Sequence, residues 1–494
     1  AQHTFFDTWQ VWDATLSNGT IEYQQGADLH VLDLKNNQAS PLELSLASDF
    51  RQRQERWLTK PLDYLTHMSF GGSDEQVALT ARSQIALAAK APRRLVNIDT
   101  PEASRSRHAI VSHDGKWVYA INDHTGENEI WRFAADGSGD AKQLTDDGST
   151  FRWNLYLSPN GRYLAHDDKD GNLWLLDLDK NRNERIYSGA NGHKPIGKLS
   201  WSHDSKALAF SRTDLEGSRN QIILYSLGDK KAEVLTSNKY ASYSPAFSPD
   251  GNWLYFLSDR HFKATPSSPW GDRNMGPVFN KRTQIYALAL KRQACFPFAP
   301  PTEVAHCDND AAEKERTARL RPKPIDWDGL TERLWQVPVA ADNYYNLSVN
   351  GSRLYVQARD NGPANLYQVP FAQTDITRDV FANNVTSYQL SNDGKRLFFR
   401  QSKPNQLYIV DAGAKAPSDL NKARIATDQW QLAINPQVEW QQMFHDAWIM
   451  HRDFLFDRNM RGVDWDAMRA QYQPLVARLT DRHELDDLFA QLLS

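Results

Sequence analysis

A short polar turn recurs along this chain, and each copy lies between two apolar runs of the length of a β-strand. The run Trp253-Leu254-Tyr255-Phe256, which follows one of the turns, is typical. Asn-Gly and Asp-Gly pairs favour the left-handed backbone of a tight turn, so the pattern predicts a series of β-hairpins. The copies are Gly72-Ser73-Asp74-Glu75, Ser112-His113-Asp114-Gly115, Ser158-Pro159-Asn160-Gly161, Ser202-His203-Asp204-Ser205, Ser248-Pro249-Asp250-Gly251, Ser348-Val349-Asn350-Gly351 and Ser391-Asn392-Asp393-Gly394.

The spacing of these turns identifies the repeating unit. Their third positions are residues 74, 114, 160, 204, 250, 350 and 393, so the intervals are 40, 46, 44, 46, 100 and 43 residues. A period in the forties with four strand signals is typical of a β-propeller blade, whose sheet buries its faces by packing radially against like sheets. Seven copies predict a mainly β fold with a seven-bladed β-propeller over residues 65–432.

One blade can be followed strand by strand, with strands predicted at residues 153–157, 163–166, 173–178 and 184–187. The 100-residue interval indicates two insertions within one blade, at about residues 261–283 and 291–325, with the outer strand resuming near residues 334–337. The charged part of the second insertion is predicted to be a solvated linker, with a functional arm as the alternative. The other third strands are predicted to begin at Glu129, Gln221, Gln284, Asn365 and Gln406.

The two ends of the chain do not follow the repeat. Residues 29–34 have the pattern of a third blade strand, so residues 1–64 are interpreted as the terminal blade of a preceding propeller plus a linker. Residues 433–494 change to helical spacing, and Asp481 with Glu484 predicts a capped third helix. Three short helices are not expected to bury their apolar faces alone, so more protein is expected on both sides.

Composition limits the partners of this chain. A net charge of −4 over 494 residues argues against a nucleic-acid partner or an anionic membrane surface. Cys295 and Cys307, twelve apart in the second insertion, have only His306 nearby and fall short of a metal site. Free thiols and a loop-closing disulfide both stay open.

Motifs that carry catalytic chemistry are missing from the sequence. It holds no Gly-x-Ser-x-Gly, no phosphate-binding loop, no His-Glu-x-x-His and no Cys-x-x-Cys. Asp486 and Asp487 are neighbours on a helix and point in different directions, so a paired acid-base role is not predicted. Structural roles are favoured for the histidines, and no catalytic, cofactor or metal residue is predicted here. The histidines considered are His113, His166, His203, His445 and His451.

The helical segment carries a specific resemblance. It reads Phe444-His445-Asp446-Ala447-Trp448, then Arg452-Asp453-Phe454, Gly462-Val463-Asp464-Trp465 and Asp481-Arg482-His483-Glu484-Leu485. With the propeller repeats before it, this segment resembles the tricorn protease homologues over nearly the whole chain. The second insertion, followed by residues 325–330 and 343–347, is also similar to bacterial members of that family.

The resemblance implies a serine endopeptidase of the tail-specific protease type. In that family two propellers precede a helical catalytic subdomain, and a Ser-His pair follows the helix that begins here at Asp481. The chain ends at Ser494, before such a pair, so the catalytic residues are expected beyond it and this chain alone is predicted to be inactive. The propeller is expected to guide or filter peptide substrates and products.

The resemblance further implies a homo-oligomer, commonly a hexamer, in the cytoplasm, with the periplasm as the alternative. Two other functions stay open. One is a non-enzymatic protein-binding propeller of the TolB or WD-repeat type. The other is a propeller that regulates a prolyl-oligopeptidase-type hydrolase, which the helical segment fits poorly.

Overall fold

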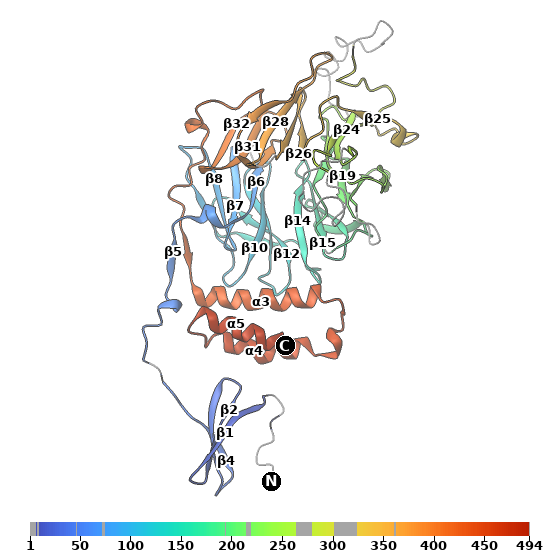
Figure 1. Cartoon of the computed structure of the whole chain (residues 1–494). Coiled ribbons are helices and arrows are strands. Elements are labelled where there is room, and N and C mark those ends of the chain that lie inside the picture. The colour runs from blue at the N-terminus through green and yellow to red at the C-terminus, as the bar shows by residue number, and fades with distance from the viewer. Residues whose placement is uncertain are drawn as a thin grey trace, which may run out of the picture. The chain divides into compact units, whose positions relative to one another are not determined.

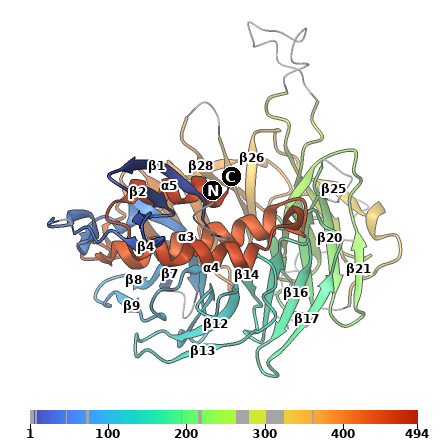
Figure 2. The same ribbon diagram turned by 90° about the horizontal axis from the view of Figure 1, so that it is seen from below.

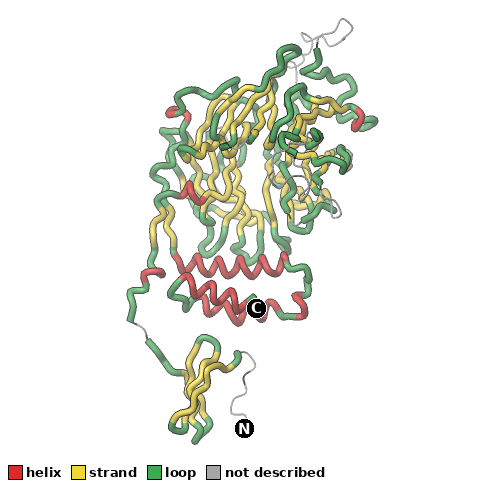
Figure 3. Tube along the Cα trace, in the orientation of Figure 1, coloured by secondary structure: helices red, strands yellow, loops and turns green. Residues whose placement is uncertain are grey.

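The computed structural model describes residues 6, 9–45, 47–71, 75–192, 194–213, 219–262, 279–300, 324–359 and 362–493. The chain divides into two compact units, each described here by itself. One is Thr59–Gln431, and the other combines Ala1–Leu58 with Leu432–Ser494. Strands make up most of the first unit, and the long helices belong to the second (Figures 1 and 3).

The described part of the unit Thr59–Gln431 contains seven antiparallel sheets, called blades 1 to 7, in which the strands pair in chain order. The predicted mainly β fold is therefore confirmed. Blade 1 consists of β6 (Leu65–Gly71), β7 (Gln76–Ala81), β8 (Gln84–Ala89) and β9 (Val96–Ile98), and blade 2 of β10 (Ser106–Val111), β11 (Trp117–Asn122), β12 (Glu129–Ala134) and β13 (Ala141–Gln143). Blade 3 consists of β14 (Arg152–Leu157), β15 (Tyr163–Asp168), β16 (Leu173–Asp177) and β17 (Arg182–Tyr187). Blade 4 consists of β18 (Leu199–Trp201), β19 (Ala207–Arg212), β20 (Gln221–Ser226) and β21 (Lys231–Val234).

Blades 5 to 7 complete the ring, and the last described sheet has three strands where the repeat predicts four. Figure 2 shows how the third and fourth strands, such as β16 and β17 or β20 and β21, succeed one another within a blade. Blade 5 consists of β22 (Ser242–Phe247), β23 (Trp253–Ser258), β24 (Gln284–Ala289) and β25 (Leu334–Gln336). Blade 6 consists of β26 (Tyr344–Val349), β27 (Arg353–Ala358), β28 (Asn365–Pro370) and β29 (Asp379–Ala382). Blade 7 consists of β30 (Val385–Leu390), β31 (Arg396–Ser402) and β32 (Asn405–Asp411).

The recurring turn has one geometry, which explains its sequence. In the blade 2 copy, the Ser112 hydroxyl donates to Asp114 Oδ1 over 2.6 Å and accepts from the Trp117 backbone N–H over 3.0 Å. The fourth residue, Gly115, has φ +69°, a conformation that glycine adopts at low cost. Four other copies repeat these contacts, and Gly72-Ser73-Asp74-Glu75 lies largely outside the described residues.

The hydrophobic core of the ring lies between neighbouring blades. Each of six clusters joins two successive blades, as where Leu254 on β23 packs with Leu224 on β20. The charged part of the second insertion, predicted to be a solvated linker, lies outside the described residues, and the described start of this insertion belongs to the core. There Phe296 and Phe298 are buried in the cluster between blades 5 and 6, while residues 263–278 and 301–323 lie outside the described residues.

Blades 7 and 1 meet without exchanging a strand. The Gln389 side chain accepts from Phe70 N–H over 2.6 Å and donates to the Met68 carbonyl over 3.1 Å. Phe70 stacks on Phe398 at 5.9 Å between ring centroids. Where blade 7 lacks a fourth strand, Ile425 bonds to β32 and forms a bridge with Lys90 of blade 1. These contacts are called the seam.

The second unit holds a sheet of its own and three helices. The sheet is β1 (Val11–Ser17), β2 (Thr20–Gln25), β3 (Asp28–Asp33) and β4 (Gln38–Pro41), and the helices are α3 (Pro436–Phe454), α4 (Trp465–Val476) and α5 (Arg482–Leu492). The helices share an apolar core, and Asp481 and Glu484 form the predicted capping box of α5.

A pair of short strands joins distant parts of this unit. Strand β5 (Arg56–Leu58) pairs with β33 (Leu432–Ile434), and Leu58 is the register partner of Leu432. The chain leaves this unit after Leu58 and returns at Leu432. The propeller is thus inserted between two antiparallel strands. Short 3-10 helices complete the described elements: η1 (Arg51–Arg53), η2 (Pro61–Tyr64), η3 (Leu330–Glu332), η4 (Asn421–Ala423) and η5 (Met460–Gly462).

Candidate functional site: the channel of the propeller

The first strands of the seven blades line the axis of the ring. Each lies at one end of its sheet, so one of its edges has no strand partner within the blade. The first strands of most successive blades contact one another, and β30 contacts β6. Unpaired strand edges carry backbone polar groups that need other partners, which makes the channel wall polar.

One polar residue from each blade occupies an equivalent position on this wall. In every first strand one residue pairs with a fully buried apolar residue of the second strand, as Val111 pairs with Val118. Three residues before it stands a polar side chain in all seven blades. These seven side chains, called the polar ring, are His67, His108, Asn154, Lys198, Ser244, Asn346 and Ser387.

The backbone is irregular at this position. Six of the first strands have a register shift at or next to it. The backbone is left-handed at His108, Ser244 and Asn346, with φ of +51°, +55° and +51°. Such bulges re-aim a side chain and leave one residue unpaired in the ladder.

Side chains of the ring bond to the strand edge of the next blade. His108 Nδ1 accepts from Leu155 N–H over 3.2 Å, and Ser244 Oγ accepts from Leu347 N–H over 2.8 Å. The polar ring therefore satisfies backbone groups that the blades leave unpaired.

Two histidines of the ring are held neutral. The rings of His67 and His108 stack with centroids 3.6 Å apart. Burial lowers the pKa of His67 to about 4, and burial together with His67 places the pKa of His108 well below its usual range. At neutral pH neither imidazole carries a charge.

Lys198 is the lysine of the polar ring, and its side chain extends to another blade. Its ammonium donates to Asn346 Oδ1 over 2.9 Å, to Ser348 Oγ over 3.1 Å and to the Leu347 carbonyl. These acceptors belong to blade 6, so the side chain passes the first strand of blade 5. Desolvation lowers the pKa of Lys198 to about 7.

The histidines considered from the sequence lie apart from this ring. His166 is buried beside Arg152 and Asn183, and burial lowers its pKa to about 3. His113 bonds to the Ser158 carbonyl over 2.7 Å and so links the turns of blades 2 and 3. His451 lies against the Trp465 ring, 4.9 Å between centroids. The described contacts of these three serve packing.

The other residues considered from the sequence are also separate. Asp486 pairs with Arg482 on the same helix over 2.7 Å, and Asp487 is exposed. Cys295 is disulfide-bonded and not a free thiol, whereas Cys307 and Ser494 lie outside the described residues. His445 on α3 and His203 in a turn are half-buried.

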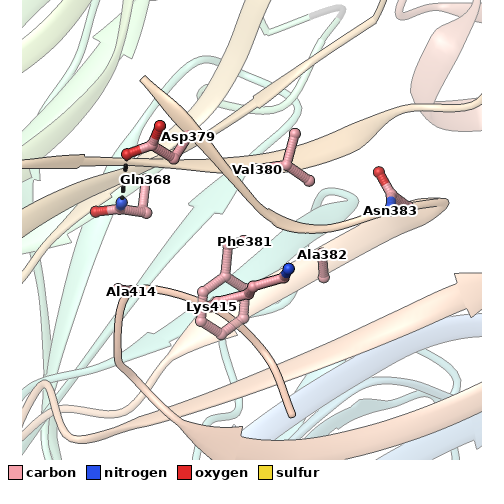
Figure 4. Close-up of a pocket in the computed structure, with 8 residues that line it drawn as sticks. All are labelled: Gln368, Asp379, Val380, Phe381, Ala382, Asn383, Ala414 and Lys415. Atoms are coloured by element: carbon pink, nitrogen blue, oxygen red, sulfur yellow. Dashed lines mark hydrogen bonds between the residues drawn. The ribbon is translucent and has the colours of Figure 1, made fainter. Parts of the chain in front are cut away.

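A shallow pocket of about 450 Å³ lies on the outer side of blade 6 (Figure 4). Gln368 donates to Asp379 within it over 3.2 Å, and Lys415 lies over β29 because the chain after β32 bonds to Phe381. Its lining has no group with a nucleophile-base arrangement. Within the described ranges, no cluster of three or more potential metal ligands occurs and no helix is both long and apolar enough to cross a bilayer.

Comparisons with known proteins agree with this architecture. Residues 65–413 match the family described as the tricorn protease second beta propeller domain, and residues 436–494 match the tricorn protease C1 domain. A putative tricorn-like protease C-terminal subunit of Sulfurisphaera tokodaii is 23% identical, covering 99% of this chain and 55% of the relative. Tricorn protease homolog 1 of Streptomyces coelicolor is 25% identical, covering 76% and 36%.

A solved structure shares the fold. The crystal structure of the tricorn protease aligns with a TM-score of 0.76 and 16% identity, over 99% of this chain and 46% of that one. The chain thus spans about half the length of the relatives that match most of it. Since the propeller match alone covers more than half of the chain, this protein belongs to the tricorn protease family.

Proposed function

We propose that this chain is the propeller and first catalytic-subdomain portion of a tricorn-like serine endopeptidase, and that its propeller guides or filters peptides. The observation that carries the proposal is the order of the two family matches, a propeller followed directly by the C1 domain. A free-standing binding propeller of the TolB type gives no reason for a C1 domain at residues 436–494.

The chemistry of the parent enzyme follows from its class. A serine attacks the peptide carbonyl, a histidine acts as general base, and backbone N–H groups stabilise the oxyanion. These residues are proposed to lie beyond Ser494. The purified 494-residue chain should then show no peptidase activity, and robust hydrolysis blocked by a serine-directed inhibitor would contradict this.

The polar channel supports the filtering role. The polar ring lies on the first strands, and the blades of a propeller surround a central channel. We propose that an extended peptide passes this channel and that a folded domain does not. Short peptides released by larger proteases are the proposed substrates.

The paired strands β5 and β33 allow a clean test. In the full-length protein, residues 59–431 are replaced by Asn-Gly, because Leu58 and Leu432 are register partners that a two-residue hairpin can join. Turnover of a tetrapeptide and of unfolded casein is then measured. The proposal expects the casein-to-tetrapeptide ratio to change. An unchanged ratio with unchanged peptide turnover would refute the filter.

Assembly and location follow the family. We propose a hexamer, which light scattering of the full-length protein tests, and a cytoplasmic location, with the periplasm as the alternative. Fractionation of expressing cells decides between the two compartments.

A further inference from the structure

The Lys198 ammonium is fixed at a defined place in the channel. Just before it, Gly197 packs so closely that a Cβ there would lie 2.1 Å from Ser211 Oγ, and its N–H donates to the Ser211 carbonyl over 2.8 Å. The preceding Ile196 N–H donates to Asp167 of blade 3 over 2.7 Å. The base of the lysine side chain is thus held from two blades.

No acid balances this charge among the described groups that contact it. Its three acceptors, Asn346, Leu347 and Ser348, are neutral oxygens. The polar ring contains no carboxylate, and Asp167 is turned to the backbone of Ile196 and Asn154, with a pKa that burial raises to about 8. Without a counter-ion, desolvation leaves Lys198 only partly protonated near pH 7, and a bound anion would favour its ammonium form.

Two further residues of the polar ring offer hydrogen-bonding atoms. They are Ser387 of blade 7 and His67 of blade 1, the blades that follow blade 6, where the Lys198 ammonium is bound. Ser387 Oγ and His67 Nε2 are both buried, and neither has a hydrogen-bond partner among the described residues. Buried polar atoms of this kind are rare in folded proteins unless something else binds them.

We propose that the polar ring is a carboxylate-binding site for peptides in transit, with Lys198 as its cation. The ammonium exchanges one of its neutral acceptors on blade 6 for the carboxylate, while His67 and Ser387 bond to the peptide backbone. This inference rests on the proposed function, since peptide traffic brings the ligand to the channel. The carboxylate comes from the C-terminus or from an acidic side chain.

Equilibrium binding to the 494-residue chain tests the site without any peptidase activity. The probes for calorimetry are N-acetylated tetra-alanine with a free C-terminus, its C-terminal amide, and the amide with one glutamate or one glutamine. We expect a carboxylate to tighten binding roughly tenfold, the effect of one charge-assisted hydrogen bond. Tighter binding of the free acid than of the amide identifies the C-terminal carboxylate as the ligand. Tighter binding of the glutamate peptide than of the glutamine peptide identifies an acidic side chain.

Variants assign the effect to Lys198. Lys198→Met should abolish the carboxylate preference, and Lys198→Arg should retain it. Lys206→Met, at an exposed lysine in the turn of the same blade, should leave it unchanged. Equal binding of acid and amide by the unaltered protein overturns the proposal, as does a preference that survives in Lys198→Met. The deletion experiment tests the filtering role, and calorimetry tests carboxylate binding by Lys198. A deletion result that refutes the filtering role does not change the binding result, so the two proposals can fail independently.

Discussion

The sheet β1–β4 and blade 2 have the same internal design but different surroundings. Both pair their strands in chain order, and both first strands carry a register shift with a left-handed residue at the third position, Asp13 (φ +49°) and His108 (φ +51°). Every residue of β1 is exposed, whereas most of β10 is buried. The interpretation of β1–β4 as a propeller blade stays a prediction, under which a blade takes its shape from its own sequence and its burial from its neighbours.

The largest contrast is expected from leucine truncations in the two settings. Leu254→Ala on β23 removes a fully buried side chain between blades 4 and 5 and should lower the free energy of unfolding by about 2–5 kcal/mol. Leu16→Ala on β1, 66% exposed, should change it by less than about 0.5 kcal/mol. Urea unfolding measures both, and equal losses would break the comparison.

Acid should destabilise the channel wall. The pKa of His67 is about 4 in the folded protein, below its value of 6.5 when unfolded, so the unfolded chain binds more protons between these values. Stability present above pH 6.5 is therefore lost as the pH falls toward 4. In His67→Gln the free energy of unfolding should fall by up to roughly 3 kcal/mol less than in the unaltered protein between pH 6.5 and pH 4. Urea midpoints from pH 4 to 8 test it. The exposed His483→Gln is the control, and matching curves for both variants would contradict the prediction.

The seam should respond to loss of one amide. Gln389→Ala leaves the Phe70 N–H and the Met68 carbonyl without their partner and should cost about 1–3 kcal/mol. Hydrogen exchange should speed up in blades 1 and 7 before blade 4. Gln401→Ala, in the same blade but bonded only to the nearby Asn383 carbonyl, is the matched control. Uniform exchange across all blades would argue against a localised seam.

The smallest expected effect concerns the turns. Ser248→Ala removes the hydroxyl that bonds Asp250 and the Trp253 N–H, at a cost of about 1 kcal/mol. The hairpin of β1 and β2 uses Asn18-Gly19, and Thr20→Val there loses one bond to the Ser17 carbonyl. Thermal midpoints should fall more for Ser248→Ala, and the reverse order would show that the two turns depend on other contacts.

Local signals explain what was predictable from the sequence. The turn residues, the third strands and the capping box at Asp481 each involve neighbours within a few residues. Features that depend on distant pairing were not predicted. The strands β5 and β33 have three residues each, and the whole propeller separates them in the sequence. Likewise, nothing near Phe296 in the sequence signals its burial between blades 5 and 6.

The polar ring was missed for the same reason. Lys198 is an ordinary lysine in the sequence, and its partners Asn346 and Ser348 lie about 150 residues further along the chain. The signal for Lys198 is its place in the repeat. It stands three residues before Trp201, which pairs with the buried Leu208 of the second strand. Aligning the blades by that pairing brings all seven polar positions into one column.

Because every blade is one uninterrupted stretch of chain, the closed circle can become an open arc while each of its sheets stays intact. The contacts of Gln389, Phe398 and Ile425 fix where that opening would occur. That joint is the junction of the ring that the chain itself does not cross, so non-covalent contacts alone hold it closed.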